Sequence, residues 1–404
     1  MNTKFFPPGG SSGPLSPYIN SYLTLVRRQG YAVGSLYEQV YVLKQCDRWL
    51  KRTGRDVRHL DESVMQDCWR RFRRGYGKNA GRSTFRRLLG LLREMGVTPA
   101  AGAKRPSPAE EVIGAYEQFL LEERNLVPAS TVQLLVFARR FLAEKFGAGP
   151  LKFSTLRALD VTAFVQRHAY EHGPYYARHL VRATRSFLHY LFYRELIQID
   201  LSLVVPKVAR WRFSTLPMHL PAAQVREVLR HCDRSTPVGR RDYAILLLLA
   251  RLGLRAGEVV RLNLEDLDWE NGHITIYGKG RWAKLPMPAD VARAIARYLR
   301  RDRPRCECRR LFLCNYAPLD GFAGASAVAG VVRRALAKAG VESARKGAHL
   351  LRHSLATDLL RRGASLHEIG EVLRHKSTDS TAIYAKVDLR SLRRLALPWP
   401  GGAQ

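Results

Sequence analysis

The 404-residue sequence is short of negative charge. It carries 67 Lys and Arg against 35 Asp and Glu, so its formal net charge is +32 and its pI is about 10.5. Such a balance is far from that of an ordinary soluble enzyme and is typical of a protein that neutralises many phosphates. The composition therefore favours nucleic acid as the partner, and we expect double-stranded DNA.

Long hydrophobic runs and a cysteine framework are also missing. The longest aliphatic run, Ala244 to Ala250, is far below the ~20 residues that cross a bilayer. Met1 is followed by Pro7-Pro8-Gly9-Gly10, where a secretory signal would be basic and then apolar. The few cysteines suggest a reducing compartment. We expect a soluble, cytoplasmic protein of two or three domains.

Three of the six cysteines lie close together in the sequence, at Cys306, Cys308 and Cys314. A metal knuckle is one interpretation, but a fourth ligand is missing and the spacing fits no common zinc pattern. The other interpretation is that they are ordinary small hydrophobic residues. We expect no metal and no cofactor.

Proline and glycine divide the chain into four parts. Pro7 to Pro17 is rich in Pro, Gly and Ser, and two further breaks run from Pro99 to Pro108 and from Pro206 to Pro217. Between them the apolar residues recur at helical spacing. We predict a disordered tail at 1–17, an N-terminal helical DNA-binding unit at 18–98, a second helical unit at 109–205 and a larger mixed domain at 217–397.

The two helical units resemble each other weakly. Leu60-Asp61 and the helix after it resemble Leu159-Asp160 and its helix, at an offset of 99 residues (159 − 60 = 99). Two copies of one DNA-clamping unit would explain this pattern. Two independent helical bundles would explain it equally well.

Basic residues gather on the predicted helices. Trp69 to Arg93 holds nine Lys and Arg and no acidic residue, and Tyr175 to His189 sets arginines beside aromatic residues. Such runs are often only solvated surfaces, but they are also what contact with a DNA backbone requires. The predicted DNA-binding residues are Arg70, Arg71, Arg73, Arg74, Arg82, Arg86, Arg178, Arg182, Arg185, Lys207 and Arg210.

The last domain opens with an apolar helix, Asp242 to Leu252, that Gly253 ends. Arg255 follows this end, and Glu258 falls in the first turn of the next helix. His273 to Tyr277 alternates as a strand and returns through Ala283 to Met287, which predicts a hairpin with Lys279 at its tip. Lys284 is a second lysine on the same hairpin.

The final quarter holds a candidate catalytic group of His349, Arg352, His375 and Tyr384. His349 and Arg352 are three positions apart, so they lie on one side of a helix and can reach the same anion. His353 is predicted to point away from that side and to be structural. His375 follows, and Tyr384 falls in a short predicted helix, Ser380 to Val387, as a possible nucleophile.

These motifs resemble the catalytic domain of the tyrosine recombinases, the phage integrase family, over residues 219 to 390. The family pattern is filled in order by Arg255 in a Gly-Leu-Arg-x-x-Glu box, Lys279, His349 with Arg352, His375 and Tyr384. The resemblance implies a mainly α fold with a small antiparallel β-sheet in the catalytic domain. It also implies a multi-domain, C-shaped DNA clamp in which residues 109–205 are the core-binding (SAM-like) domain.

The resemblance also implies the chemistry. Tyr384 is the nucleophile of a 3′-phosphotyrosyl intermediate, and Arg255 and Arg352 neutralise the phosphate. Lys279 is the general acid, with Lys284 as an alternative, and His349 is the base or proton shuttle. His375 donates a hydrogen bond to the phosphate. The expected partners are double-stranded DNA and a homotetramer, or related recombinases, in a synaptic complex.

Two positions depart from the family pattern. Arg374 stands where glycine is usual, so the turn before His375 is expected to differ, and Leu350 stands where an acidic residue is common. Leucines after Tyr384, in 388–397, predict a helix that packs on its own domain or on a neighbour. The leading hypothesis is a recombinase of a mobile element. A nicking-closing enzyme like the type IB topoisomerases and a catalytically silent DNA-binding protein remain alternatives.

Overall fold

The computed structural model describes residues 13–72, 80–99, 107–147, 149–208, 216–278 and 280–387. The chain divides into two compact units, one formed by 1–100 with 213–404 and the other by 101–212. Within the described ranges it is mainly helical, with one three-stranded antiparallel sheet, as predicted. None of the helices in these ranges is long and apolar enough to cross a membrane.

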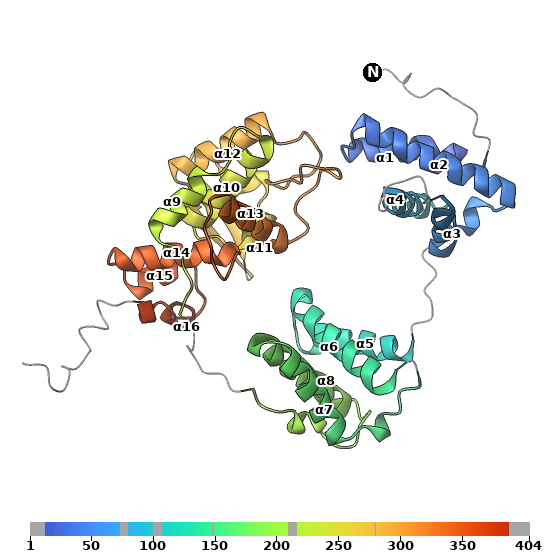
Figure 1. The fold of residues 1–404 in the computed structure, drawn as a ribbon, viewed down its shortest axis with the longest axis horizontal. Helices are drawn as coiled ribbons and strands as arrows, with labels where there is room; N and C mark the ends of the chain where they lie inside the picture. The colour runs from blue at the N-terminus through green and yellow to red at the C-terminus, as the bar shows by residue number, and fades with distance from the viewer. Residues whose placement is uncertain are drawn as a thin grey trace, which may run out of the picture. The chain divides into compact units, whose positions relative to one another are not determined.

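Residues 13–99, here called the first helical unit, form a core of their own (Figure 1). Its helices are α1 (Ile19–Arg28), α2 (Val33–Thr53), α3 (Glu62–Phe72) and α4 (Ala80–Glu94), with 3-10 turns η1 (Ser16–Tyr18) and η2 (Val57–His59). The core begins earlier than predicted, because Leu15 is 1% exposed and its backbone N–H donates to Asp47 over 2.6 Å. The predicted disordered tail is therefore wrong for residues 13–17.

Residues 107–208, the second helical unit, pack around a separate core of Tyr116, Phe141 and Phe187. Its helices are α5 (Pro108–Gln118), the π-helical η4 (Phe119–Glu123), α6 (Pro128–Phe146), α7 (Ala158–Glu171) and α8 (Pro174–Tyr193), with 3-10 turns η5 (Phe153–Thr155) and η6 (Leu201–Val204). Ser107 starts α5 by accepting a hydrogen bond from the backbone N–H of Glu110, which satisfies one of the N–H groups left open at a helix start.

Residues 216–387, the C-terminal part, hold the largest core and the sheet. The helices are α9 (Ala222–Arg230), α10 (Pro237–Arg251), α11 (Ala256–Arg261), α12 (Ala289–Arg301), α13 (Ala325–Lys338), α14 (Ala348–Arg361), α15 (Leu366–Val372) and α16 (Asp379–Ala382), with 3-10 turns η7 (Leu264–Asp266) and η8 (Ala385–Val387). The strands are β1 (Leu267–Asp268), β2 (His273–Gly278) and β3 (Arg281–Pro286).

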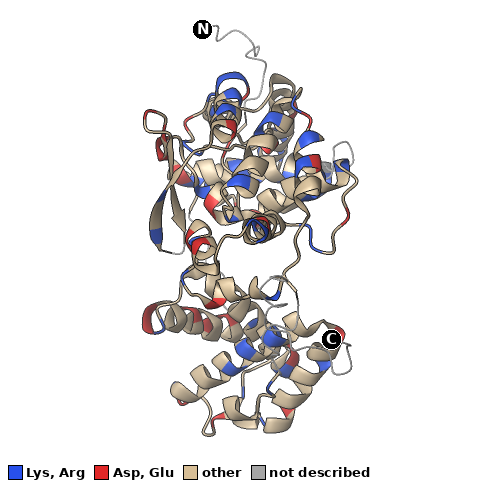
Figure 2. Cartoon of the chain, turned by 90° about the vertical axis from the view of Figure 1, so that its left-hand side faces the viewer, with Lys and Arg blue, Asp and Glu red and all other residues tan. Residues whose placement is uncertain are grey.

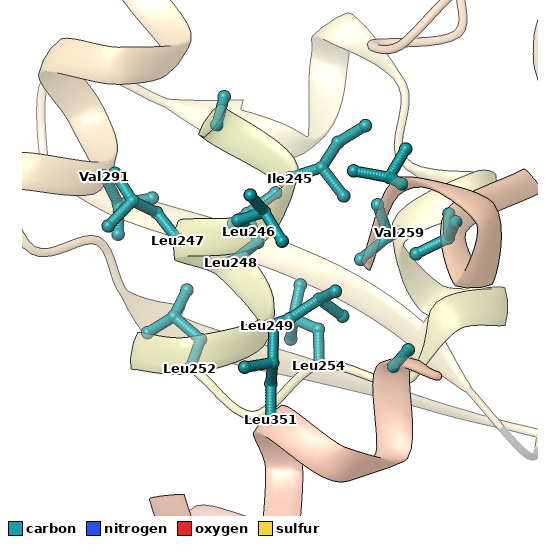
Figure 3. Packing of buried hydrophobic residues seen from close by; sticks show 14 of the residues in the cluster. Ile245, Leu246, Leu247, Leu248, Leu249, Leu252, Leu254, Val259, Val291 and Leu351 are labelled. Carbon is teal, nitrogen blue, oxygen red and sulfur yellow. The ribbon is translucent and has the colours of Figure 1, made fainter. Parts of the chain in front are cut away.

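Helix α10 runs through the middle of this core (Figure 3). Ile245 to Leu249 are almost fully buried, so the helix is apolar around most of its circumference and must be covered on several sides. Val291 of α12 and Leu351 of α14 are among the residues that cover it. The buried helix thereby fixes the place where the chain leaves it, at Gly253.

The sheet is the predicted hairpin with one short strand added. Strand β2 pairs antiparallel with β3, with Ile274 opposite Leu285 and Tyr277 opposite Trp282. Ile274 and Ile276 are buried while the residues between them are not, which is the alternation expected of a strand that covers a core on one face. The strand order is β1-β2-β3.

Candidate active site

The turn after α10 builds the first part of the site. Gly253 has φ +57°, a left-handed conformation that costs glycine little, and Arg255 is the N-cap of α11. Glu258 is 2% exposed and accepts from the backbone N–H of Arg255 over 2.8 Å and from its Nη1 over 2.7 Å. Burial alone would raise the pKa of Glu258, but these hydrogen bonds and nearby positive charge hold that pKa below its usual value.

Arg352 lies on the buried face of α14 and connects this helix to two other segments, at Gly253 and at Leu373. Its side chain is almost wholly buried, and it donates from Nη1 to the carbonyl of Gly253 and from Nη2 to the carbonyl of Leu373. Burial, together with the positive charges of Arg255 and Arg374, lowers the pKa of Arg352 to about 9. At neutral pH the guanidinium group is therefore still positively charged. A phosphate bound next to it would stabilise this buried charge.

Arg374, the departure from the family pattern, completes this part. It adopts φ +54°, so a side chain occupies a left-handed turn that glycine usually fills. Its Nη2 lies 3.3 Å from Glu258 Oε2, and its carbonyl accepts from Arg255 Nη2 over 3.3 Å. Arg255, Glu258 and Arg374 thus form a closed ring of hydrogen bonds, which ties the turn before His375 to the Arg255 box.

Tyr384 lies in a small cluster of its own between α16 and η8. Its side chain is 1% exposed and packs with Ala356, Ile369 and Leu373. Burial raises the pKa of Tyr384 to about 12, against the opposing effect of the Arg352 charge. The phenol is therefore neutral at physiological pH, and a reaction at its oxygen requires a base.

His353 is the residue that contacts this phenol. Its Nδ1 lies 2.7 Å from Tyr384 Oη, so the prediction that it points away from the site is wrong. Burial and the neighbouring positive charges, His349 foremost, lower the pKa of His353 to about 4. A neutral imidazole is the form that can accept the phenolic proton.

The two predicted histidines, His349 and His375, come from different segments. His349 is exposed at the start of α14, its ring centre 6.2 Å from that of His353, and both line a cavity of about 530 Å³. His375 follows Arg374 directly, and its Nδ1 lies 2.7 Å from Thr381 Oγ1. His353 thus contacts the phenol, His349 lies next to His353, and His375 contacts Thr381 of α16, three residues before Tyr384.

Lys279 lies outside the described residues. Strand β2, which leads to it, ends next to Glu258. Gly278 lies so close to this side chain that a Cβ added there would be 2.5 Å from Glu258 Oε1. Lys284, the alternative acid, is 3.2 Å from Asp268 Oδ2 and is thereby engaged across the sheet.

The cysteines and acidic residues give no metal centre in the part of the chain that the structure describes. All six cysteines are free, and no group of three or more His, Cys, Asp or Glu there is placed to hold a metal ion. Cys308 Sγ contacts Asp320 Oδ1 over 2.9 Å.

The predicted DNA-binding residues differ in their exposure and in their contacts within the chain. Lys and Arg occur on helices throughout the chain (Figure 2). The exposed ones among the predicted set are Arg70, Arg71, Arg82, Arg86, Arg178, Arg182 and Lys207. Arg185 is half-buried and donates to the carbonyl of Val205 over 2.9 Å, which anchors the end of the unit. Arg73, Arg74 and Arg210 lie outside the described residues.

Comparison with known proteins decides the family. Residues 219–390 match the phage integrase family model. The putative integrase/recombinase y4rA of Sinorhizobium fredii (strain NBRC 101917 / NGR234) is 41% identical over 407 residues, which cover 100% of this chain and 99% of that protein. The chain belongs to the phage integrase family. Tyrosine recombinase XerD of Listeria monocytogenes serotype 4b (strain F2365) is 30% identical to this integrase family member, over 69% of this chain and 94% of that protein.

Solved structures agree on the fold. XerH site-specific recombinase bound to palindromic difH substrate, in its post-cleavage complex, has a TM-score of 0.54 with 21% identity and covers 70% of this chain and 83% of its own. Tn1549 transposon integrase in complex with a circular intermediate DNA has a TM-score of 0.52 with 18% identity, over 70% of this chain and 99% of its own. At these identities the likeness establishes that this integrase family member shares their fold.

Proposed function

We propose that this phage integrase family member is a site-specific DNA recombinase of a mobile element, which cuts and rejoins strands through a 3′-phosphotyrosyl bond at Tyr384. The observation that carries the proposal is the joint anchoring of two guanidinium groups beside a phenol. Arg352 donates to the carbonyl of Leu373, and Arg255 to that of the next residue, Arg374. The charge of Arg352 also acts on Tyr384.

In the first step Tyr384 Oη attacks the phosphorus of a DNA phosphodiester. The new oxygen–phosphorus bond forms as the bond to the 5′ oxygen breaks, and Lys279 supplies the proton that the leaving oxygen takes up. Arg255 and Arg352 donate to the non-bridging oxygens, whose charge must be stabilised when phosphorus is five-coordinate. In the second step the 5′ hydroxyl of another strand attacks phosphorus and releases the tyrosine.

The three histidines have different proposed roles. His353 Nδ1 lies 2.7 Å from Tyr384 Oη, and this contact orients the hydroxyl. His349 is the proposed base or shuttle, because it is exposed on the same face of α14, next to His353. His375 is proposed to donate to the phosphate from the turn that Arg374 holds.

DNA is gripped by the exposed basic residues of the second helical unit. Arg178, Arg182 and Lys207 line one cavity of about 810 Å³ in the second helical unit. Guanidinium and ammonium groups on such a surface neutralise phosphates and set the position of the duplex without reading its bases. We also propose a homotetrameric synaptic complex. The name of the Tn1549 transposon integrase supports the mobile-element role, and the name of y4rA, a putative integrase/recombinase, supports recombination.

A covalent-trapping experiment tests the proposal. Wild-type protein is incubated with a library of nicked suicide duplexes, and a protein–DNA adduct is sought on a denaturing gel. We expect an adduct with wild type and none with Tyr384→Phe, because the substitution removes only the attacking oxygen. An adduct that never transfers to a second duplex would indicate a nicking-closing enzyme, and no adduct with wild type would indicate a silent DNA-binding protein.

A further inference from the structure

The two helical units have the same order of elements. Each contains a first helix, a long second helix, a 3-10 turn and two further helices, α1 to α4 around η2 and α5 to α8 around η5. Figure 1 draws the first set in blue and the second in green. The shared order suggests a repeat, but order alone does not fix which residues correspond.

The turn before the third helix fixes the register. Leu60 ends η2 with φ −74° and ψ 126°, and Leu156 ends η5 with φ −74° and ψ 125°. Both side chains are buried, at 1% and 8% exposure. The offset is therefore 96 residues (156 − 60 = 96). The offset of 99 that the sequence suggested is wrong, because Leu159 is 81% exposed.

Buried positions follow this register through two helices. The pairs that are buried in both units at an offset of 96 are Met65 with Val161, Cys68 with Phe164, Trp69 with Val165, Thr84 with Leu180, Phe85 with Val181, Leu88 with Thr184 and Leu92 with Leu188. In the second helix of each unit the offset is 95, with Val40 matching Leu135 and Cys46 matching Phe141. A match in backbone turn and in core pattern together is not expected of unrelated bundles.

The exposed arginines follow the register too. Arg82 of α4 corresponds to Arg178 of α8, and Arg86 corresponds to Arg182, each at an offset of 96 (178 − 82, 182 − 86). All four are exposed. Each pair also lines a cavity in its own unit, of about 380 Å³ in the first and about 810 Å³ in the second.

The other arginines on α4 have different tasks. Arg87 donates to Tyr31 Oη over 2.6 Å and to Gln39 Oε1 over 3.2 Å, and Arg93 pairs with Glu62 over 2.8 Å. In the described residues Arg82 and Arg86 have no such hydrogen bond or ion pair, so their charge stays available to an external anion.

We propose that the first helical unit is a second copy of the DNA-gripping unit, and that Arg82 and Arg86 contact the phosphate backbone of a further stretch of duplex DNA. The inference rests on the proposed DNA contact of Arg178 and Arg182. It assigns to residues 13–99 a binding role that extends the protein's contact with DNA beyond the cleaved linkage. The partner is duplex DNA because the corresponding residues of the second unit, Arg178 and Arg182, are proposed to grip it, and guanidinium groups pair with backbone phosphates without reading bases.

Salt dependence of binding tests this role in the full-length chain. Affinity for a 60-base-pair duplex is measured at several salt concentrations for wild type and for the double variant Arg82→Ala/Arg86→Ala. Each phosphate contact contributes roughly 0.9 to the slope of log affinity against log salt, so we expect the slope to fall by about 2. The variant Arg82→Lys/Arg86→Lys, which keeps the charge, should restore most of the slope.

A matched control removes equal charge elsewhere in the same unit. Arg48 and Arg52 are exposed on α2, and Arg48→Ala/Arg52→Ala should leave the slope near that of wild type. An unchanged slope for Arg82→Ala/Arg86→Ala would overturn the inference. If Arg178→Ala/Arg182→Ala still lowers the slope, the proposed function stands and only this inference fails. If that pair has no effect either, the proposed DNA grip fails with it.

Discussion

The phosphate side and the nucleophile side of the candidate site are built differently. Arg255, Glu258 and Arg352 stand on α11 and α14, next to the large core around α10. Tyr384 belongs instead to a small cluster, beside a helix of four residues. Because apolar burial supplies most of the stability of a segment, the phosphate side should stay in place while the nucleophile side is displaced at low cost.

The difference suggests a division of labour. The guanidinium groups are fixed by contacts within the chain, with a buried carboxylate and with backbone carbonyls. The phenol is held by a single imidazole and is 1% exposed, so it has to leave that contact to reach a phosphorus atom. If Tyr384 is the nucleophile, as proposed, a preformed anion site with a displaceable phenol would keep Tyr384 unreactive until DNA is bound.

Replacing Arg352 should have the largest effect. We expect Arg352→Lys to slow single-turnover cleavage on the order of 10³-fold, because an ammonium that keeps both carbonyl contacts has one N–H left and cannot donate to both non-bridging oxygens of the phosphate. Arg251→Lys is the control, since Arg251 pairs on the surface with Asp290. A rate within tenfold of wild type for Arg352→Lys would contradict the view that the phosphate side depends on this guanidinium group.

A matched pair of cavity variants compares the two regions directly. Leu248 in the large core and Ile369 in the small cluster are both fully buried. We expect Leu248→Ala to lower the free energy of unfolding by about 4 kcal/mol and Ile369→Ala by about 2 kcal/mol, since the smaller cluster can collapse more easily. Nitration of Tyr384, measured by mass spectrometry, should rise only in Ile369→Ala. Equal losses of stability would remove the distinction.

The smallest expected effect is the pH dependence of the nucleophile side. The pKa of His353 is lowered to about 4, so the native state binds its proton less readily than the unfolded chain. His353 therefore stabilises the fold fully above pH ~6.5, and this contribution of at most about 3 kcal/mol is lost as pH falls towards ~4. Denaturant unfolding of wild type and of His353→Asn from pH 7 to 4 measures it. The pH dependence should be shallower in the variant, and identical curves would contradict this assignment.

Much of the phosphate side could be predicted because local rules determine it. Gly253 after the apolar helix predicts the turn. Glu258, three residues after Arg255, predicts the contact that caps the next helix. The hairpin also follows from alternation, although its strands are His273–Gly278 and Arg281–Pro286, shifted slightly from the predicted runs.

The contacts between distant segments could not be predicted in this way. Arg374 was visible only as a departure, because nothing local shows that its guanidinium reaches Glu258, 116 residues away in sequence. Arg185 was predicted to bind DNA, and nothing local in the sequence shows that it also donates to the carbonyl of Val205. His353 did leave a signal, since a residue four positions after His349 shares its face of the helix.

The two hydrogen bonds from Arg352 to backbone carbonyls determine how many of its N–H groups remain for other partners. A guanidinium group has five N–H bonds, and one on each Nη atom is directed to Gly253 and Leu373. Three N–H bonds remain, enough to serve both non-bridging oxygens of one phosphate. An ammonium group in the same place would have a single N–H left, so among the standard side chains only arginine could keep both carbonyl bonds and also make the proposed contact with both oxygens of a phosphate.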